Sequence, residues 1–394
     1  MWEPARQHPN LPGVTEARKL LQELASEKAS CAPRQVDKAL ILYGAGDLGK
    51  MAKEFLGRLE IPFLYVVDAN AHRYAGNKTW AGIPVVKPAD VPEEHRTKCL
   101  LVICISTAPY TSIAAPLLKM GWQDIVPFYD ITEAYVDKCP LSNGWFTGDL
   151  NADDLEGIEY VLDHWGDDVS RAHHLQFIAW HGLRKEFIFA GAPVTTDDRF
   201  FIPQVISSLH DKEIFLDGGA HHGEVSIRFL NKIHHRFQKI YAFEPDRHNV
   251  QVLRTKLGGE NGSTSPDIQI IECALGKESG SSPFFHGLDY ASQFSSLAPE
   301  SVPVRTLDDM DIPATIIKLH LEGWEYDALL GSMHNLIKYR PILMVTTYHK
   351  RNGLWQLPVL LMKNLQDYIF LLRLHGWMGA GCVMYAIPRE RYSC

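Results

Sequence analysis

The chain has 394 residues, of which 46% are hydrophobic and 22% are charged. This length favours two or three domains, and the composition is that of a folded globular protein. With 39 basic and 47 acidic residues, the net charge is −8. Proteins that bind nucleic acids or anionic membrane surfaces usually carry a basic face, so we predict neither kind of partner.

The seven cysteines are scattered along the chain, and no two of them follow the Cys-x-x-Cys spacing of zinc and redox motifs. This pattern predicts reduced thiols. The first residues, MWEPARQHPNLPG, contain no apolar segment typical of a secretion signal. Apolar runs such as CLLVICI at 99–105 are far too short to span a bilayer. Together these observations predict a cytoplasmic protein.

The first part of the chain begins with a predicted exposed helix at 15–29. Short apolar strands then alternate with amphipathic helices, a pattern that predicts βαβ units and a parallel sheet. The expected strands are 39–44, 62–68 and 98–106, and the expected helices are 48–59 and 112–121. The alternation stops in a turn-rich, acidic segment that is predicted to be a helical connector. Within it, His173 and His174 are predicted to lie on a solvated helix surface.

The alternation resumes at Glu213. Seven strands are expected there, at 213–219, 239–245, 267–276, 315–323, 341–349, 367–376 and 382–388. The sequence therefore predicts two doubly wound α/β domains. The predicted boundaries are an N-terminal helical extension at 1–35, a Rossmann-like domain at 36–137, a helical connector at 138–204 and a second α/β domain at 205–394.

A glycine turn follows the first strand of the second domain, in the text LDGGAHHGE. Asp217 ends the strand, and Gly218, Gly219 and Gly223 would let backbone N–H groups approach a ligand. Glu244 ends the next strand, where an acid can bind both hydroxyls of a ribose. The spacing lacks the GxGxxG of dinucleotide sites, so we predict an adenosyl ligand without a pyrophosphate. The alternative is a tight turn that binds nothing.

A second glycine turn lies in the first domain, where Gly44, Gly46 and Gly49 form GxGxxG between a strand and a helix. Asp68 ends the next strand and could bind a ribose. The motif predicts a second nucleotide site, with NAD or another nucleotide as its ligand. The alternative is a Rossmann-shaped domain that packs or dimerises without a ligand, and the sequence is compatible with a homodimer.

The second domain resembles the FkbM-type S-adenosylmethionine-dependent methyltransferases over about residues 160–390. The motifs that carry the resemblance are LDGGAHHGE, AFEPD, VRTLDDM, IKLHLEGWEYDALLG, PILMVTTYHKRNGLWQLP and VMYAIP. The resemblance implies a class I methyltransferase sheet with six parallel strands and one antiparallel strand. It also implies that Asp217, Gly219 and Gly223 line the methionine and ribose, that Glu244 binds the ribose, and that Cys273 and Ala274 flank adenine.

The segment at about 38–135 is similar to the N-terminal Rossmann-like domain of bacterial sugar-modifying enzymes, some of which hold a nucleotide or a nucleotide-sugar. The similarity is carried by the segments GAGDLGK and VVDANAHRYAGNKTWAGIPVVKPADV. This resemblance implies that a nucleotide-binding module precedes the methyltransferase, and it makes a nucleotide-linked sugar a candidate acceptor.

The chain departs from the FkbM pattern at two positions. IKLHLEG carries His320 in place of the usual aspartate, and HKRNGLW carries Gly353 where the family tends to have an acid. His320 and Glu322 are two residues apart, so they would point the same way on a continuing strand, and His349 ends the next strand. We predict that the three converge on the acceptor hydroxyl, with His320 or His349 as the base and no metal. A metal site of two histidines and one carboxylate, or an inactive enzyme, are the alternatives.

The predicted function is therefore O-methyl transfer from S-adenosylmethionine to a hydroxyl of a saccharide, a nucleotide-sugar or a secondary metabolite. The main rival is an NAD(P)-dependent oxidoreductase that uses the first domain. A third hypothesis is a non-catalytic nucleotide-sensing protein with a degenerate methyltransferase domain.

Overall fold

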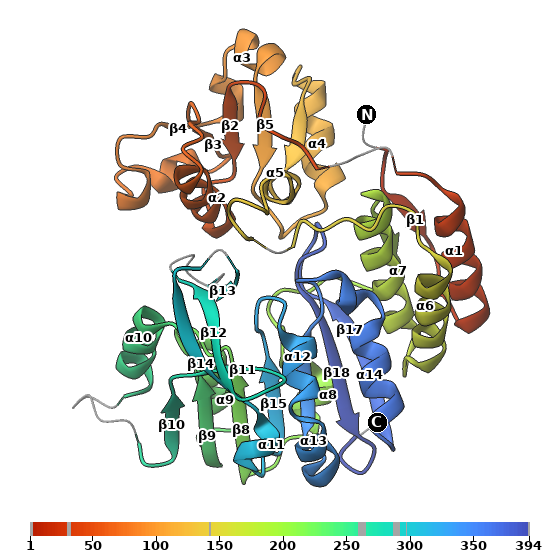
Figure 1. Ribbon diagram of the computed structural model, residues 1–394. Helices are drawn as coiled ribbons and strands as arrows, with labels where there is room; N and C mark the ends of the chain where they lie inside the picture. The colour runs from red at the N-terminus through yellow and green to blue at the C-terminus, as the bar shows by residue number, and fades with distance from the viewer. Residues whose placement is uncertain are drawn as a thin grey trace.

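The computed structural model describes residues 3–29, 33–141, 143–258, 265–286, 292–296 and 298–392. Figure 1 shows two large sheets stacked end to end, with a group of helices beside them. The predicted fold class, two doubly wound α/β sheets, is confirmed.

The first large sheet is parallel throughout and has the strand order β4-β3-β2-β5-β6. Its strands are β2 (Leu40–Tyr43), β3 (Val66–Val67), β4 (Val85–Val86), β5 (Leu100–Ile103) and β6 (Ile125–Pro127). Its helices are α2 (Asp47–Arg58), α3 (Glu93–Lys98), α4 (Tyr110–Lys119) and α5 (Phe128–Ala134), with short 3-10 turns η1 (Ala71–Tyr74), η2 (Lys78–Trp80) and η3 (Pro88–Asp90). The apolar strands β2 and β5 are buried on both faces, with only Tyr43 partly exposed, as expected for central parallel strands.

The second large sheet has seven strands in the order β10-β9-β8-β15-β16-β18-β17, and only β18 runs antiparallel to its neighbours. The strands are β8 (Glu213–Gly218), β9 (Phe237–Phe243), β10 (Ile268–Ile271), β15 (Ile316–Leu319), β16 (Ile342–Thr346), β17 (Tyr368–Leu374) and β18 (Cys382–Pro388). The helical elements are α8 (Pro203–Ser207), α9 (Glu224–Lys232), α10 (Arg247–Leu257), α11 (Leu307–Met310), α12 (Glu325–Leu330), α13 (Met333–Tyr339), η5 (Arg351–Leu354) and α14 (Gln356–Asn364). The expected six parallel strands and one antiparallel strand are therefore present.

A small four-stranded sheet lies over one end of the seven-stranded sheet (Figure 1). It has the order β11-β14-β12-β13, with β11 (Ala274–Leu275), β12 (Gly280–Phe285), β13 (Gln293–Phe294) and β14 (Glu300–Arg305). The predicted single strand at 267–276 is thus divided between two sheets. The division follows β10, where Cys273 N bonds back to Ile271 O and the chain turns out of the large sheet.

The N-terminal segment and the middle of the chain form one helical layer. Helix α1 (Val14–Ser26) packs against α6 (Ala152–His164) and α7 (Asp168–Leu183), and β1 (Arg6–His8) pairs with β7 (Phe187–Phe189). Because α7 also packs on β17, it is enclosed on all sides. The prediction that His173 and His174 are solvated is therefore wrong. Both are buried, and the predicted exposed helix at 15–29 buries one face of leucines.

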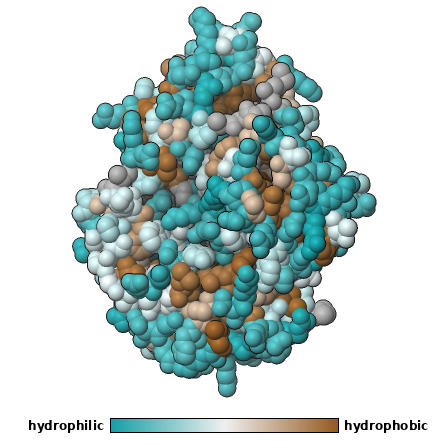
Figure 2. Space-filling model, turned by 45° about the vertical axis from the view of Figure 1, so that its right-hand side comes forward, coloured by the Kyte–Doolittle hydropathy of each residue, from teal (hydrophilic) through white to brown (hydrophobic). Residues whose placement is uncertain are grey.

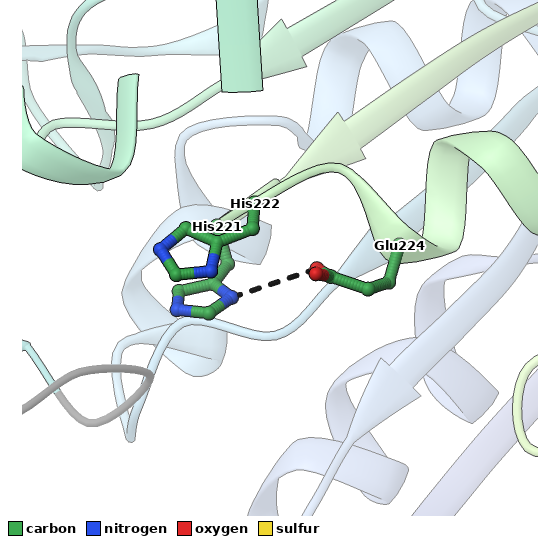
Figure 3. A group of neighbouring side chains, drawn as sticks. All are labelled: His221, His222 and Glu224. Atoms are coloured by element: carbon green, nitrogen blue, oxygen red, sulfur yellow. Dashed lines mark ion pairs between the residues drawn. The ribbon is translucent and has the colours of Figure 1, made fainter. Parts of the chain in front are cut away.

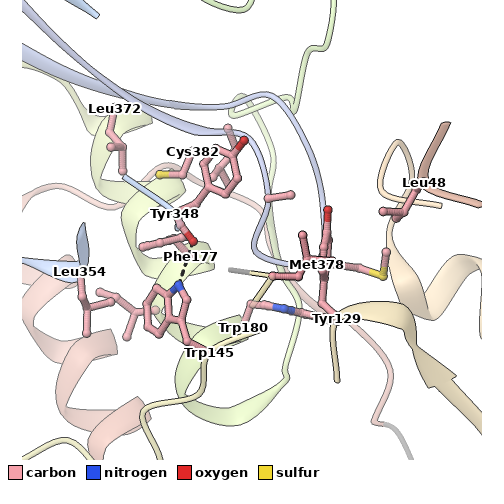
Figure 4. Close-up of a cluster of buried hydrophobic side chains, with 14 of the residues drawn as sticks. Leu48, Tyr129, Trp145, Phe177, Trp180, Tyr348, Leu354, Leu372, Met378 and Cys382 are labelled. Carbon is pink, nitrogen blue, oxygen red and sulfur yellow. Dashed lines mark hydrogen bonds between the residues drawn. The ribbon is translucent and has the colours of Figure 1, made fainter. Parts of the chain in front are cut away.

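The apolar core is continuous between the two large sheets. Figure 4 shows Leu48 of α2 and Tyr129 of α5 near Met378, which lies between β17 and β18. In the same cluster, Trp145 Nε1 donates a hydrogen bond of 2.8 Å to the carbonyl of Tyr348. Buried side chains of both sheets belong to this one cluster, so the sheets are packed as a single body.

The face shown in Figure 2 is mostly hydrophilic, with hydrophobic residues in separate patches. Among the described residues, no helix combines the length and apolar character that a membrane crossing requires.

Candidate active site

One cavity of about 430 Å³ lies where the carboxyl ends of the two large sheets face each other. Segments that follow β2, β5 and β6 contribute Asp47, Ser106 and Tyr129 to its wall. Segments that follow β8 and β15 contribute Gly219 and His320 from the opposite side. Volumes of roughly 300–1,000 Å³ are typical of small-molecule sites, so the cavity is large enough for a ligand of that size.

The turn after β8 forms one wall of this cavity. Gly219 has a φ of +72°, and a Cβ there would lie 2.0 Å from the carbonyl oxygen of His320, so the turn requires glycine. Asp217 lies beneath the turn and is fully buried. Its carboxylate accepts hydrogen bonds from Lys318 Nζ at 2.9 Å and from Ser226 Oγ at 2.7 Å. Asp217 therefore holds the turn in place and is not part of the cavity wall.

Glu244 directly follows β9 and lies on the cavity wall. Its carboxylate accepts a hydrogen bond from the backbone N of His221 at 2.8 Å and another from the backbone N of Asp246 at 2.9 Å. Burial raises the pKa of Glu244, although these bonds to the ionised form oppose that shift. The carboxylate thus closes the glycine turn and still has lone pairs that a ligand hydroxyl can use.

The other residues assigned to the cofactor from the sequence divide into two groups. Cys273 and Ala274, which follow β10, line the cavity. Gly218 and Gly223 do not line it. Gly223 has a φ of +84°, and a Cβ there would lie 2.8 Å from a methyl group of Leu253. Gly223 is therefore required for the packing of α9 against α10.

His320, Glu322 and His349 lie together at the carboxyl ends of β15 and β16. His320 Nε2 is 3.0 Å from Glu322 Oε1, and the same oxygen is 3.3 Å from His349 Nε2. The two imidazole rings are nearly parallel, with centroids 5.1 Å apart. His349 Nδ1 is 2.8 Å from Glu325 Oε1, and the hydroxyl of Tyr348 is 3.2 Å from His320 Nε2.

The structural reason for this convergence differs from the one inferred from the sequence. Strand β15 ends at Leu319, so His320 and Glu322 do not share a strand face. Glu322 has a φ of +49° and Gly323 a φ of +97°, which places both in a left-handed turn. It is this turn, rather than a continuing strand, that brings the Glu322 carboxylate next to both histidines.

The charges of the three groups are unequal. Burial lowers the pKa of His320 to about 3, so its imidazole is neutral at physiological pH. Burial alone would also lower the pKa of His349, but the carboxylates of Glu322 and Glu325 outweigh it and raise that pKa well above the ordinary value. Burial would raise the pKa of Glu322, but the neighbouring His349 and His320 hold it well below its usual range. In the absence of another cation, His349 is therefore the charged imidazole.

Comparison with known families identifies the second sheet. Residues 217–376 match the sequence model of the methyltransferase FkbM domain. The protein carries an FkbM methyltransferase domain. The match includes the turn after β8, Glu244 and the cluster of His320, Glu322 and His349. Comparison with curated protein sequences finds no match.

Solved structures support this fold. The crystal structure of methyltransferase FkbM from Methylobacillus flagellatus KT is 18% identical, with a TM-score of 0.57 over 96% of this chain and 94% of that chain. At this identity the likeness is one of fold. A precorrin-6y C5,15-methyltransferase from Geobacter metallireducens GS-15 is 14% identical, with a TM-score of 0.29 over 49% of this chain and 90% of that chain, which is too low to support an argument.

The other predicted nucleotide site differs from the FkbM domain in its surroundings. Gly44 has a φ of +110°, and Asp68 accepts a hydrogen bond of 2.8 Å from the backbone N of Ala45. The indole of Trp80 donates a bond of 3.1 Å to the carbonyl of Ala45 and lies 3.7 Å from a Cβ built on Gly49. Trp80 therefore packs against this turn. Neither Gly46 nor Asp68 lines the cavity between the sheets.

A second group of histidines and a carboxylate follows the turn after β8 (Figure 3). His221 and His222 stack with ring centroids 3.7 Å apart, and His221 Nδ1 is 3.6 Å from Glu224 Oε2. His222 Nε2 is 3.1 Å from Asn249 Oδ1, and Glu224 also pairs with Lys256. These ring nitrogens and this carboxylate already have protein partners.

Several site residues were not predicted from the sequence. Lys318 is buried in the middle of an otherwise apolar strand, and its register partner on β8 is Asp217. A lysine within such a strand requires a buried anion, and this requirement could have revealed the pair. Tyr348 and Arg199 also line the cavity, where Arg199 Nη2 donates to the Tyr348 hydroxyl at 2.9 Å. Arg199 carries no local motif, so only the fold reveals its position.

Proposed function

We propose that the protein is an S-adenosylmethionine-dependent O-methyltransferase whose acceptor is a hydroxyl of a saccharide, a nucleotide-sugar or a related metabolite. The observation that carries this proposal is the cavity between the sheets. Its FkbM side contains the glycine turn and Glu244, and its other side contains polar residues of the first sheet. A cofactor and an acceptor could therefore meet in one enclosed space.

The FkbM side of the cavity fits an adenosyl ligand. Glu244 closes the glycine turn through His221 N and can still accept hydrogen bonds from ribose hydroxyls. Cys273 and Ala274 would contact the adenine. When bound, S-adenosylmethionine supplies a methyl group on a sulfonium, which is already a good leaving group. The main task of the protein is therefore to hold two reactants in line and exclude water.

The opposite side of the cavity fits a polar acceptor. Asp47, Ser106, Tyr129 and Asn143 line it. Asn143 Oδ1 is buried and makes no hydrogen bond to the part of the chain that the structure describes. It could accept a hydrogen bond from an acceptor hydroxyl, which would satisfy a buried polar atom. A wall of this kind favours a polyhydroxylated acceptor over an apolar one.

The cluster of His320, Glu322 and His349 would face the reacting hydroxyl. His320 and Glu322 line the cavity, whereas the side chain of His349 lies behind them. Of the two histidines considered as general base, His320 is therefore the candidate, because it is neutral and reaches the cavity. His349 would act through Glu322 as a positioning residue.

A calorimetric titration with S-adenosylhomocysteine tests binding of the cofactor. The reaction is tested by incubating the protein with S-adenosylmethionine and a panel of sugars and nucleotide-sugars and measuring the S-adenosylhomocysteine that forms. We expect micromolar binding, and turnover with at least one polyhydroxylated acceptor. Ser106→Ala and Asn143→Ala should raise the KM for that acceptor several-fold without changing the affinity for S-adenosylhomocysteine. Ser112→Ala, on α4 and away from the cavity, is the matched control. Binding of NAD without binding of S-adenosylhomocysteine would instead favour the oxidoreductase hypothesis.

A further inference from the structure

Three donor atoms in the cluster surround one point at the edge of the cavity. Glu322 Oε1 is 3.0 Å from His320 Nε2 and 3.3 Å from His349 Nε2, and all three atoms lie within 4.8 Å of one another. Nitrogen and oxygen ligands lie about 2.0–2.2 Å from a transition-metal cation, so neighbouring ligands of one ion are roughly 3.0–3.5 Å apart. The two shorter separations in the cluster match this spacing.

His349 Nε2 has no hydrogen-bond partner among the described residues, although only 2% of His349 is exposed. Its separation of 3.3 Å from Glu322 Oε1 is that of an ion pair, and the contact does not meet the geometry of a hydrogen bond. Buried polar atoms are almost always paired, so an orphaned nitrogen that faces a carboxylate and a second imidazole indicates a missing partner at that point.

The other nitrogen of His349 is held as in many metal sites. Nδ1 bonds to Glu325 Oε1 at 2.8 Å, and the same oxygen accepts bonds from the backbone N of Leu321 and the hydroxyl of Thr346. A carboxylate that binds one imidazole nitrogen fixes the ring and directs the other nitrogen at a metal. Glu322 and Glu325 are both buried, so a divalent cation would also offset two neighbouring negative charges.

We propose that His320, Glu322 and His349 form a binding site for a divalent transition-metal cation, such as Mn²⁺, Fe²⁺, Co²⁺ or Zn²⁺. Two imidazoles with one carboxylate favour these ions over Mg²⁺ and Ca²⁺, which prefer oxygen ligands. The ion would replace the contact of 3.2 Å between His320 Nε2 and the Tyr348 hydroxyl.

The role of this ion in catalysis rests on the proposed function, whereas its binding does not. Because His320 and Glu322 line the cavity, a coordination position of the ion would be open to the acceptor. A bound cation lowers the pKa of a hydroxyl that coordinates it, and the proton would pass to water in the cavity. Under this proposal, His320 is a metal ligand and not the general base.

The test uses Co²⁺ as a spectroscopic probe of the full chain after treatment with a chelator. We expect saturable visible absorption at one equivalent of Co²⁺. Glu322→Gln and His349→Gln should each weaken binding at least 100-fold. Glu325→Gln should weaken it about 10- to 100-fold, because it removes only the group that orients His349. His320→Asp should keep three ligands and shift the preference toward Mg²⁺.

His222→Gln is the matched control, since it alters the other group of histidines and a carboxylate. Its Co²⁺ titration should be unchanged. If His349→Gln does not fold, His320→Ala, at a partly exposed position, provides the same test. Absence of Co²⁺ absorption in the natural sequence, or loss of binding in His222→Gln alone, would overturn the metal site.

Titration with S-adenosylhomocysteine on the same samples separates the two proposals. Cofactor binding, with methyl transfer that persists in chelator, would overturn the catalytic role of the ion and leave the methyltransferase intact. Co²⁺ binding without cofactor binding would overturn the proposed methyltransferase and leave the metal site intact.

Discussion

The two glycine turns of this protein have the same plan and different surroundings. In each, a glycine of positive φ follows the first strand of a parallel sheet, and an acid at the end of the next strand accepts a backbone N–H from the turn. Beneath the turns the residues differ. Tyr43 on β2 pairs in register with Ile103 on β5, whereas Asp217 on β8 pairs with Lys318 on β15. One turn rests on an apolar pair and the other on a buried ion pair.

The turns also differ in what lies over them. Trp80 packs against the first turn through its bond to Ala45, whereas the second turn opens into the cavity between the sheets. The two acids therefore make the same intramolecular bond, but only Glu244 lines that cavity. A glycine turn with its paired acid indicates a type of fold. The residues packed against it determine whether a ligand has room.

The largest expected effect is on the ion pair beneath the second turn. Lys318→Met should lower the free energy of unfolding by about 3–5 kcal/mol, because it leaves Asp217 buried without its cation. Chemical denaturation measures this change. The double variant Asp217→Asn with Lys318→Met should cost less than the sum of the two single variants. In the first sheet, Ile103→Val should cost only about 1 kcal/mol. If Lys318→Met and Ile103→Val lowered the free energy of unfolding equally, the buried ion pair would not distinguish the second turn from the first.

The next effect concerns the two paired acids. Glu244→Gln should weaken the binding of S-adenosylhomocysteine by about 1–3 kcal/mol, since it removes a charged acceptor for ribose hydroxyls. Asp68→Asn should leave that affinity unchanged, because Asp68 does not line the cavity between the sheets. Calorimetry measures the affinity of both variants for S-adenosylhomocysteine. Unchanged affinity in Glu244→Gln would show that the cofactor is bound elsewhere.

The same acid should make binding depend on pH. Burial raises the pKa of Glu244, so this carboxyl takes up a proton at a higher pH than an exposed glutamate does. A protonated carboxyl is a weaker acceptor, and the affinity for S-adenosylhomocysteine should fall as the pH falls through that pKa. The stability of the ligand-free protein should change in the opposite direction. The raised pKa contributes stability at low pH that is lost as the pH rises. In Glu244→Gln, the affinity for S-adenosylhomocysteine and the stability of the ligand-free protein should both depend less on pH.

The smallest effect is expected at the centre of the first GxGxxG. Gly46 has an ordinary φ of −73°, and a Cβ there would have no atom within 4 Å. Gly46→Ala should therefore change the free energy of unfolding by no more than about 0.5 kcal/mol and leave cofactor affinity unchanged. Thermal unfolding and calorimetry check this outcome. A clear loss of binding for any nucleotide in this variant would show that the first turn is a ligand site.

The sequence predicted the parts of this molecule that depend on local pattern. Strand alternation located both sheets, and the rule that parallel strands end at one edge placed His320, Glu322 and His349 near one another. It did not predict that β15 stops at Leu319 or that Glu322 adopts a left-handed conformation. Asp217 was predicted to contact the ligand, but it pairs with Lys318. This pair was missed because Lys318 lies on a strand far along the chain. Trp80 was also not predicted, since its contact with Ala45 depends on tertiary packing.

The pairing of β1 with β7 bears on how the protein is made. The first sheet lies between these strands in the sequence, so it can fold during synthesis before β7 leaves the ribosome. Helix α1, however, buries Ala17, Leu20, Leu21 and Leu24 against α6 and α7, which are translated later. Until then its apolar face is exposed on the nascent chain. A chaperone that binds short amphipathic helices would have its target there until α6 and α7 are made.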